Sequence, residues 1–393
     1  MKHTIVSHHA DNGGCGHYRM KFPYWALQSM SKQINVIETM KYIPIPQFYR
    51  DIRLVRIQRQ VSDQQAEFII KFLAPISKKF GFWLAYEIDD VFGMEDIPIY
   101  NSGWEVFQNK KFMDNAKNIF KACDVVTVTT DALANYYIKK FGVDKNKIYK
   151  VPNYLPKWWV ANKYDEERIE QRFDSLSGRK PRIGFISSTT HYDIFNRNGG
   201  VDDFTHIIPF VKENIDKMDF VFCGGIPQQL KKEFEDDKIT YIKGYDILNY
   251  PTEVVRLNLD LVIAPLQDNI FNRCKSNIKF LEMGALGIPC ICQDLEPYRK
   301  YTDTRFDDVD DLSDMVHELL GSKDKYMDNV KHNYDVVYNG DSAKPTGWLL
   351  ENNIQDWLKL YCINQKTLEF DVTEYVEGDS MLNQPNDGQL FEA

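Results

Sequence analysis

Short apolar runs alternate along the chain with stretches in which apolar residues recur at helical spacing. Apolar runs bounded by turn residues indicate buried strands, and spacings of three or four residues indicate helices. Strands are predicted at 4–7, 34–37, 53–59, 82–88, 124–129, 148–153, 182–187, 219–223, 239–244, 259–264 and 290–292. Helices are predicted at 18–29, 62–80, before 123, after 131, and at 276–286, 307–335 and 348–362. This alternation predicts an α/β protein with parallel sheets.

The alternation divides into two halves near residues 161–181, a charged stretch that ends Ser-Gly-Arg-Lys-Pro and has the composition of a linker. We predict two Rossmann-like domains, residues 1–165 and 166–345, facing each other across a cleft. Ligands of such sheets collect at the carboxyl ends of the strands. Residues 371–393 hold six acids and no Lys or Arg, so we expect a loose acidic tail.

The composition narrows the class of protein. The chain has 393 residues, of which 43% are hydrophobic and 27% charged, as in ordinary globular proteins. No apolar run approaches the about 20 residues of a membrane span, and the N-terminus lacks the apolar core of a signal peptide. Seven cysteines without paired metal spacing favour reduced thiols and no resident metal. We therefore expect a cytoplasmic protein, located in the host cytoplasm if it is viral.

The most informative stretch, Asn272–Pro289, lies between two predicted buried strands. Ser276 is a candidate N-cap of its helix, and Gly287 and Pro289 end that helix. Lys275, Ser276 and Asn277 then sit at a helix N-terminus, which favours an anion. A packed βαβ unit with solvated Lys and Glu side chains is the alternative interpretation.

The run KSNIKFLEMGALGIP, from Lys275 to Pro289, resembles the donor-binding signature of GT-B glycosyltransferases in the retaining, family-4-like group. This resemblance implies that Glu282 holds the ribose of a sugar nucleotide and that Lys275 stabilises the leaving diphosphate. The usual motif has a second Glu eight residues before Glu282, where this chain has Cys274. Asn272 and Lys275 are the local substitutes for contacts to the donor sugar.

A glycine-rich loop follows the first strand. Gly14, Cys15 and Gly16 lie between a strand and a helix, where backbone can approach a phosphate, although a plain tight turn fits the same residues. The loop resembles the opening loop of the same glycosyltransferases, which faces the donor diphosphate. The resemblance makes His17 and Arg19 candidates for contacts to phosphate or acceptor.

Two carboxylates, Asp89 and Asp90, end the fourth strand of the first half. Acids at the tip of an apolar strand indicate a site, and a helix cap or turn is the alternative. The phrase Tyr-Glu-Ile-Asp-Asp resembles strand ends in this group, and some phage DNA glucosyltransferases place a catalytic Asp there. Arg59 ends the preceding basic strand and is a candidate acceptor contact; a solvated, half-exposed strand explains its charges equally well.

Other candidates lie at strand ends and after the first half. Ser187, Ser188 and His191 follow the first strand of the second half and resemble the first donor-domain loop of the group. Gly224 and Tyr245 belong to further loops expected near the donor. Trp158 and Trp159 point to opposite faces, so one is a candidate platform for a sugar or base.

The resemblance implies a retaining, metal-independent transfer from a nucleotide-sugar, UDP-linked, with no other cofactor. It also implies that a terminal helix within 346–370 crosses back to the first domain. The preferred acceptor is hydroxymethylcytosine in double-stranded DNA, modified with glucose or arabinose as in tailed phages. The side chains that would line the DNA groove are Arg50, Arg53, Arg56, Arg59, Lys110, Lys111, Lys139, Lys140, Trp158 and Trp159.

The net charge of −9 argues against DNA, and two other functions stay open. One is a glycosyltransferase that modifies a polysaccharide or cell-surface glycan. The other is an inactive module that binds a sugar nucleotide, since Cys274 replaces the usual Glu. The sequence does not specify the sugar, the nucleotide base or the oligomeric state.

Overall fold

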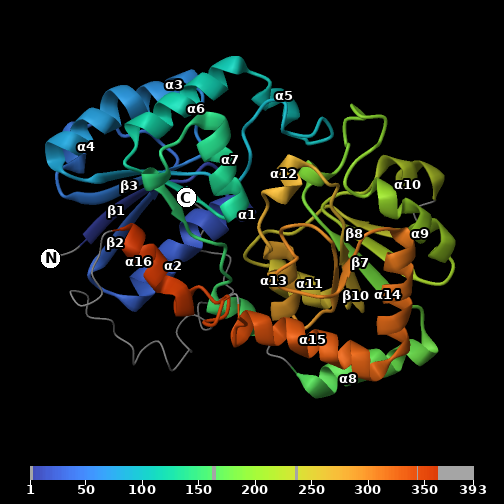
Figure 1. Cartoon of the computed structure of the whole chain (residues 1–393). Helices are drawn as coiled ribbons and strands as arrows, with labels where there is room; N and C mark the ends of the chain where they lie inside the picture. The colour runs from blue at the N-terminus through green and yellow to red at the C-terminus, as the bar shows by residue number, and fades with distance from the viewer. Residues whose placement is uncertain (1–2, 162–164, 235–237, 343, 362–393) are drawn as a thin grey trace.

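The chain forms two six-stranded parallel sheets, one in each half (Figure 1). The computed structural model describes residues 3–161, 165–234, 238–342 and 344–361, so the predicted acidic tail lies outside the described residues. The strand order is β2-β1-β3-β4-β5-β6 in the first sheet and β12-β11-β10-β7-β8-β9 in the second. Ligands of open α/β sheets of this kind bind outside the carboxyl ends of the strands.

The strands follow the predicted apolar runs closely. Those of the first sheet are β1 His3–His8, β2 Ile34–Thr39, β3 Ile52–Gln58, β4 Trp83–Glu87, β5 Val125–Val128 and β6 Ile148–Lys150. Those of the second are β7 Arg182–Ile186, β8 Asp219–Cys223, β9 Ile239–Ile242, β10 Leu261–Ala264, β11 Cys290–Gln293 and β12 Arg305–Phe306.

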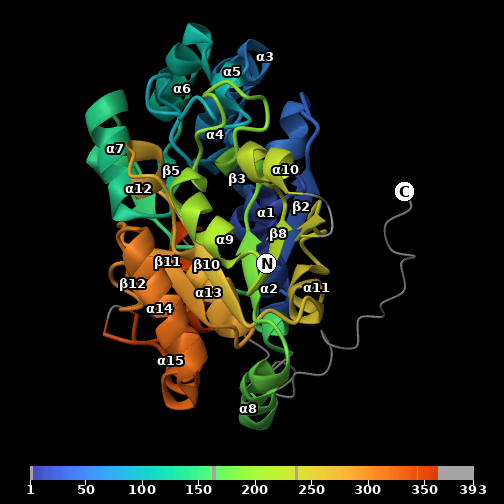
Figure 2. The ribbon, with the colours of Figure 1, turned by 90° about the vertical axis from the view of Figure 1, so that its right-hand side faces the viewer.

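Helices cover both faces of each sheet, as Figure 2 shows from a second side. The α-helices of the first half are α1 Gly14–Gly16, α2 Phe22–Met30, α3 Asp63–Glu67, α4 Ala74–Phe80, α5 Trp104–Phe107, α6 Lys110–Ala122 and α7 Asp131–Phe141. Later α-helices are α8 Glu166–Asp174, α9 Ile208–Asn214, α10 Gln228–Glu233, α11 Tyr250–Arg256, α12 Ile270–Arg273, α13 Ile278–Ala285, α14 Val309–Gly321, α15 Lys323–Tyr338 and α16 Ile354–Leu360. Within the described residues, no helix has the length and apolar character that would let it cross a membrane.

The remaining turns are short helices of other types. They are the π-helices η1 His17–Lys21 and η3 Phe68–Leu73 and the 3₁₀-helices η2 Pro46–Tyr49, η4 Lys145–Lys147, η5 Lys157–Ala161, η6 Ser175–Gly178, η7 Thr189–His191, η8 Thr205–Ile207 and η9 Glu351–Asn353. The two π-helices lie inside longer helical stretches, at residues 14–30 and 63–80. Such π-helical turns within α-helices often occur near functional sites, and the first of them follows the glycine-rich loop.

Local sequence explains the ends of several helices. Ser62 begins the helical stretch at 63–80 with a capping box, because its side chain accepts from the Gln65 amide while the Gln65 side chain bonds the Ser62 amide. Gly81 ends the stretch in a left-handed conformation, with φ of 78°. Both ends match the prediction.

Three local predictions were wrong. The stretch expected to be only a linker contains α8, capped by Asp165, whose Ile169 packs in a small core beside α15. The first helical stretch begins at Gly14 rather than Tyr18. Ser276 does not cap α13, because Asn277 holds the N-cap position and makes no side-chain capping bond. The Ser276 hydroxyl is instead bonded to the Asn153 amide at 2.9 Å.

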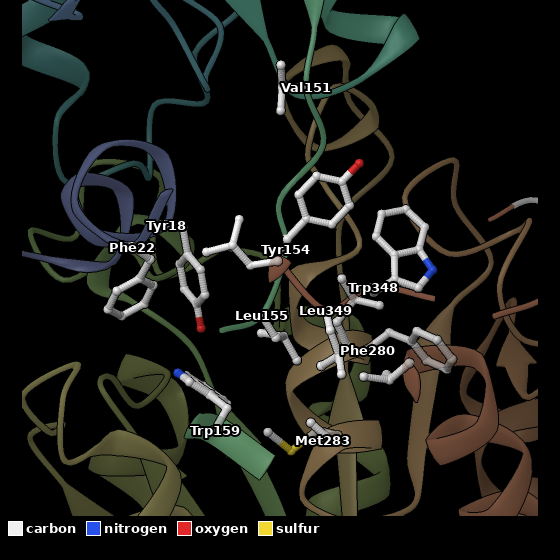
Figure 3. Packing of buried hydrophobic residues seen from close by; sticks show 14 of the residues in the cluster. Tyr18, Phe22, Val151, Tyr154, Leu155, Trp159, Phe280, Met283, Trp348 and Leu349 are labelled. Atoms are coloured by element: carbon white, nitrogen blue, oxygen red, sulfur yellow. The ribbon is translucent and has the colours of Figure 1, made fainter. Parts of the chain in front are cut away.

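Within the described residues, the chain crosses from the first half to the second near Leu155 and returns near Leu349, and the two crossing segments lie side by side. Leu155 lies on the outgoing segment, and its amide donates to Trp348 O at 3.0 Å on the returning segment. The Leu350 amide donates to Leu155 O at 2.8 Å, so the two segments run parallel and bonded. Figure 3 shows Leu155, Leu349 and Phe280 gathered there, in a hydrophobic core to which both halves contribute.

The last described helix, α16, returns to the first half, where it lies beside α2 (Figure 1). Tyr361 stacks on Tyr24 with ring centroids 5.9 Å apart. Trp357 is buried beneath two guanidinium groups, those of Arg56 at 4.6 Å and Arg19 at 5.4 Å. The expected α/β fold with two parallel sheets and a returning terminal helix is confirmed.

Those guanidinium groups belong to a fully buried ion cluster centred on Glu87. Arg19 Nε donates to Glu87 Oε1 at 2.6 Å, and Arg56 Nη2 donates to Glu87 Oε2. Burial alone would raise the pKa of Glu87, but the two guanidinium groups outweigh it and lower that pKa. The carboxylate is therefore charged, and its removal would leave two buried cations without a counter-ion.

We expect Glu87→Gln to destabilise the protein strongly. Breaking a buried ion pair by neutralising one partner typically costs about 3–5 kcal/mol. The matched control is Glu67→Gln, since Glu67 pairs with Lys71 at 2.8 Å on the exposed surface. That change should alter stability by less than about 1 kcal/mol. Urea unfolding followed by fluorescence measures both; equal midpoints for the two variants would contradict the assignment.

Candidate active site

A cavity of about 430 Å³ lies between the carboxyl ends of the two sheets. Its walls come from the loops after β1, β3 and β4 on one side and after β7 and β10, with the start of α13, on the other. Predicted site residues that line it are Gly14, Cys15, Arg19, Arg59, Asp89, Asp90, Ser187, Ser188, His191, Lys275, Ser276 and Glu282. The fold thus gathers residues that are up to 268 positions apart, from Gly14 to Glu282.

The glycine-rich loop is shaped by Asp11. Its Oδ1 accepts from the Gly13 amide at 2.7 Å and from the Gly16 amide at 3.2 Å. Its Oδ2 accepts from Arg59 Nη2 at 2.7 Å. Asp11 therefore already holds the Gly16 amide, which the sequence offered to a phosphate, together with the Gly13 amide. The loop is a preformed wall of the cavity. An Asp shortly before two glycines is a local turn signal, so the turn that Asp11 shapes could have been predicted from the sequence.

A compact charged cluster lies where β3 and β4 end. Arg59 has a left-handed backbone, with φ of 32°, which is uncommon for a residue other than glycine. Its guanidinium lies 3.5 Å from Asp89 and 3.6 Å from Asp90, besides the shorter contact to Asp11. Three carboxylates thus share one arginine, and Lys275 of the second half approaches Asp90 at 3.4 Å.

Burial shifts the proton affinities in this cluster. It raises the pKa of Asp89, with Asp90 adding to the shift and Arg59 opposing it. Burial, followed by the charge of Asp89, also raises the pKa of the Cys15 thiol. The thiol and the two carboxylates lie within 4.8 Å of one another, a separation that a metal ion could bridge. Arg59 supplies a positive charge beside these groups.

Glu282 lies at the other end of the cavity. Its Oε1 accepts from Tyr18 OH at 2.9 Å, and its Oε2 accepts from Tyr250 OH at 3.0 Å and Lys279 Nζ at 2.5 Å. Tyr18 belongs to the first half and the other residues to the second. Burial and the nearby carboxylate raise the pKa of Tyr18, which keeps its hydroxyl protonated as a donor. A carboxylate held in this way can still accept bonds from sugar hydroxyl groups.

The start of α13 lies at the cavity, where the sequence predicts an anion-binding helix N-terminus. Because the helix has no side-chain cap, its first amides are open to a bound anion. Lys275 lies just before it and lines the cavity. The helix has eight residues, and its dipole adds to the charge of the lysine.

Some predicted contacts in the first half do not fit the structure. Arg19 reaches the cavity wall, but its side chain is fully buried and bonded to Glu87, Val151 O and Asn153, which hold its guanidinium inside the first half. His17 is buried and bonded to Gly13 O, and Trp159 is 1% exposed in the core. His17 and Arg19 are enclosed by partners of the first domain and its returning helix, whereas Trp159 packs between Tyr18 of the first half and Tyr250 of the second.

Other predicted residues lie outside the cavity wall, namely Gly16, Trp158, Gly224, Tyr245, Asn272 and Asn277. Trp158 packs edge-on against Phe22. Gly224 has φ of 95°, and a Cβ there would lie 1.9 Å from Ser187 O, so its role is close packing of two strand ends. Cys274, in place of the usual Glu, is 2% exposed and packs against the core of the first half.

The structure adds residues that the sequence analysis missed. Tyr18, Asn153, Thr190, Lys279 and Tyr298 also line the cavity. Lys279 falls within the recognised motif and could have been found there. Tyr18 and Tyr298 could not, because aromatic residues at helical spacing usually indicate core.

The fold resembles those of solved glycosyltransferases at low sequence identity. A glycosyltransferase from Rickettsia africae ESF-5 matches with a TM-score of 0.57 and 11% identity, covering 92% of this chain and 98% of that one. Anabaena HepE in complex with UDP and glucose matches with a TM-score of 0.59 and 10% identity, covering 92% and 100%. The chain has the GT-B fold.

A third GT-B structure agrees with this assignment. WaaG, a glycosyltransferase involved in lipopolysaccharide biosynthesis, matches with a TM-score of 0.52 and 10% identity, covering 90% of this chain and 98% of that one. No family model matches the sequence, and comparison with curated proteins gives no match. The predicted fold class is therefore confirmed by architecture.

Two glycines of one loop give a matched test of its geometry. A Cβ at Gly16 would lie 1.9 Å from Asp11 O, whereas at Gly14 the nearest atom is a Tyr18 ring carbon at 3.9 Å. We expect Gly16→Ala to cost about 1–3 kcal/mol of stability, as overpacking does. Gly14→Ala should leave stability nearly unchanged. Thermal unfolding of both variants checks this, and equal loss in both would show that the loop does not depend on the close approach.

Proposed function

We propose that this protein is a glycosyltransferase that moves a sugar from a UDP-linked donor to an acceptor hydroxyl. The observation that carries the proposal is the cavity between two Rossmann-like domains, with an uncapped helix N-terminus, Lys275 and Glu282 on one wall. Helix N-termini and lysines bind phosphate, and a carboxylate binds ribose hydroxyl groups. The fold it shares with HepE, whose structure was determined with UDP and glucose, supports the same donor.

The donor would lie along the cavity from Glu282 to Asp89. Glu282 receives the ribose, and the diphosphate lies at the start of α13 beside Lys275. The transferred sugar then points to Cys15, Asp89 and Asp90. Domain closure keeps water out, which protects the donor from hydrolysis.

The leaving diphosphate gains negative charge as the glycosidic bond breaks. In this scheme Lys275 and the first amides of α13, which lie at the cavity, stabilise this charge. Retention of configuration and independence from metal are parts of the proposal. In this scheme Asp90, held by Arg59 and Lys275, orients the acceptor hydroxyl.

We propose a glycan rather than DNA as the acceptor. Of the side chains expected to line a DNA groove, Arg56 and Trp159 are buried. Lys111 pairs with Asp63 at 3.3 Å, and Lys140 pairs with Glu95 and Asp96. These contacts reduce the positive charge available to phosphates on that surface. The likeness to WaaG, described as involved in lipopolysaccharide biosynthesis, supports a glycan.

A donor screen tests the proposal. The protein is incubated with UDP- and GDP-sugars, alone and with oligosaccharides or with duplex DNA containing hydroxymethylcytosine, and free nucleotide and acceptor mass are measured. We expect UDP release and mass gain on a glycan. Mass gain on DNA, with DNA affinity that falls steeply as salt rises, would identify the other acceptor. UDP binding without release from any donor would indicate the binding module.

We expect Lys275→Ala to weaken UDP binding by about 10- to 100-fold, because a hydrogen bond to a charged group contributes about 1.5–3 kcal/mol. The matched control is Lys71→Ala, a lysine on the exposed surface that pairs with Glu67. Titration calorimetry gives both dissociation constants. Unchanged affinity in the Lys275 variant would remove this residue from the site.

A further inference from the structure

His191 and Asp203 form a dyad on the wall of the cavity. His191 Nδ1 lies 2.6 Å from Asp203 Oδ2, and the imidazole is 14% exposed while the carboxylate is 1% exposed. Because a carboxylate only accepts, it fixes the proton of a neutral imidazole on Nδ1. The ring lines the cavity, so Nε2 is the nitrogen left to meet a ligand.

Asp203 is held in place by both domains. Its Oδ1 accepts from Tyr100 OH at 2.6 Å, Asn272 Nδ2 at 2.6 Å and the Gln267 amide at 2.9 Å. Tyr100 belongs to the first domain and the other donors to the second. Three donors on one oxygen fix the carboxylate, so its second oxygen is directed at the imidazole. Asn272, expected at the donor sugar, is one of these supports.

The charges around His191 favour its neutral form while the cavity is empty. Burial lowers the pKa of His191, and the Lys275 ammonium lowers it further, whereas Asp203 and, more weakly, Asp90 oppose the shift. A neutral imidazole bonded in this way presents the Nε2 lone pair to the cavity. That lone pair would repel a phosphate oxygen beside Lys275.

We propose that His191 takes up a proton from solvent when a nucleoside diphosphate binds, and that Asp203 is the positioning residue for this step. The proposal rests on the proposed function, since it uses the same diphosphate position. The added proton converts Nε2 from an acceptor into a donor. The imidazolium then bridges the Asp203 carboxylate and a phosphate oxygen, and the proton returns to solvent on product release.

The direction of the pH dependence follows from this linkage. The bound anion raises the pKa of His191 above its value in the empty cavity. Between these two values the complex binds more protons than the free protein, so affinity falls as pH rises, by at most about tenfold per pH unit for one proton. Below both values the dependence on His191 disappears.

Proton uptake can be measured directly. Calorimetric titration with UDP near pH 7, in buffers of different ionisation enthalpy, gives the number of protons taken up. The terminal phosphate of UDP itself titrates near pH 6, at about the value of other phosphate monoesters. Subtracting the uptake of His191→Gln removes this contribution. We expect wild type to take up more protons than His191→Gln, and Asp203→Asn to lie between them.

The control is His206→Gln. His206 is a second half-buried histidine of the same domain, bonded to Gln293 at 2.7 Å and absent from the cavity wall. Its variant should take up as many protons as wild type. Equal uptake by wild type and His191→Gln, with UDP bound by both, would overturn the inference and leave the proposed function standing. Failure of wild type to bind UDP would overturn the proposed function itself.

Nuclear magnetic resonance of ¹⁵N-histidine-labelled wild type tests the inference even if a variant fails to bind UDP or to fold. The signal of His191 should report a neutral ring in the free protein at pH 7 and a doubly protonated ring with saturating UDP. A ring that stays neutral in the complex would overturn the inference.

Discussion

The buried carboxylate of Glu87 is the point on which the first domain and its connections depend. Arg19 reaches it from the helix after the glycine-rich loop, and Arg56 from the neighbouring strand. Arg19 also donates to Val151 O at 2.6 Å, at the start of the crossing between domains. Trp357 of the last described helix covers both guanidinium groups. One charge therefore fixes the position of the loop, the crossing and the returning helix relative to one another.

Hydrophobic periodicity was sufficient to predict every strand except β12, because most central strands are short runs dominated by buried apolar residues. The edge strand β12 has only two residues, Arg305 and Phe306, and gives no such run. Periodicity could not predict the Glu87 cluster. Arg19 and Glu87 are 68 residues apart, and arginines are mostly exposed, so the sequence favoured an exposed ligand contact for Arg19. The burial of a charge depends on which partner the tertiary fold supplies.

The candidate site shows the same contrast between residues that a local motif predicts and partners that only the tertiary fold brings together. Lys275 and Glu282 are separated by two helical turns, so a local motif was enough to place both on one wall of the cavity. Tyr18, which bonds Glu282, is 264 residues away from it, and Tyr100, which bonds Asp203, is 103 residues away from that carboxylate. Those partners meet only when the two domains pack together. Contacts across the cleft therefore could not be predicted from any local stretch of the sequence.

The paired crossing at Leu155 and Leu349 determines how the domains can move. Two bonded parallel segments resist twisting about their own direction, whereas bending across them disturbs few bonds. The connection should therefore act as a hinge with one preferred axis, along which the cleft opens and shuts. A cut in the returning segment would leave the two domains covalently joined through the segment at Leu155. After a cut in the outgoing segment, only non-covalent packing, including that of α16 on α2, would hold them together.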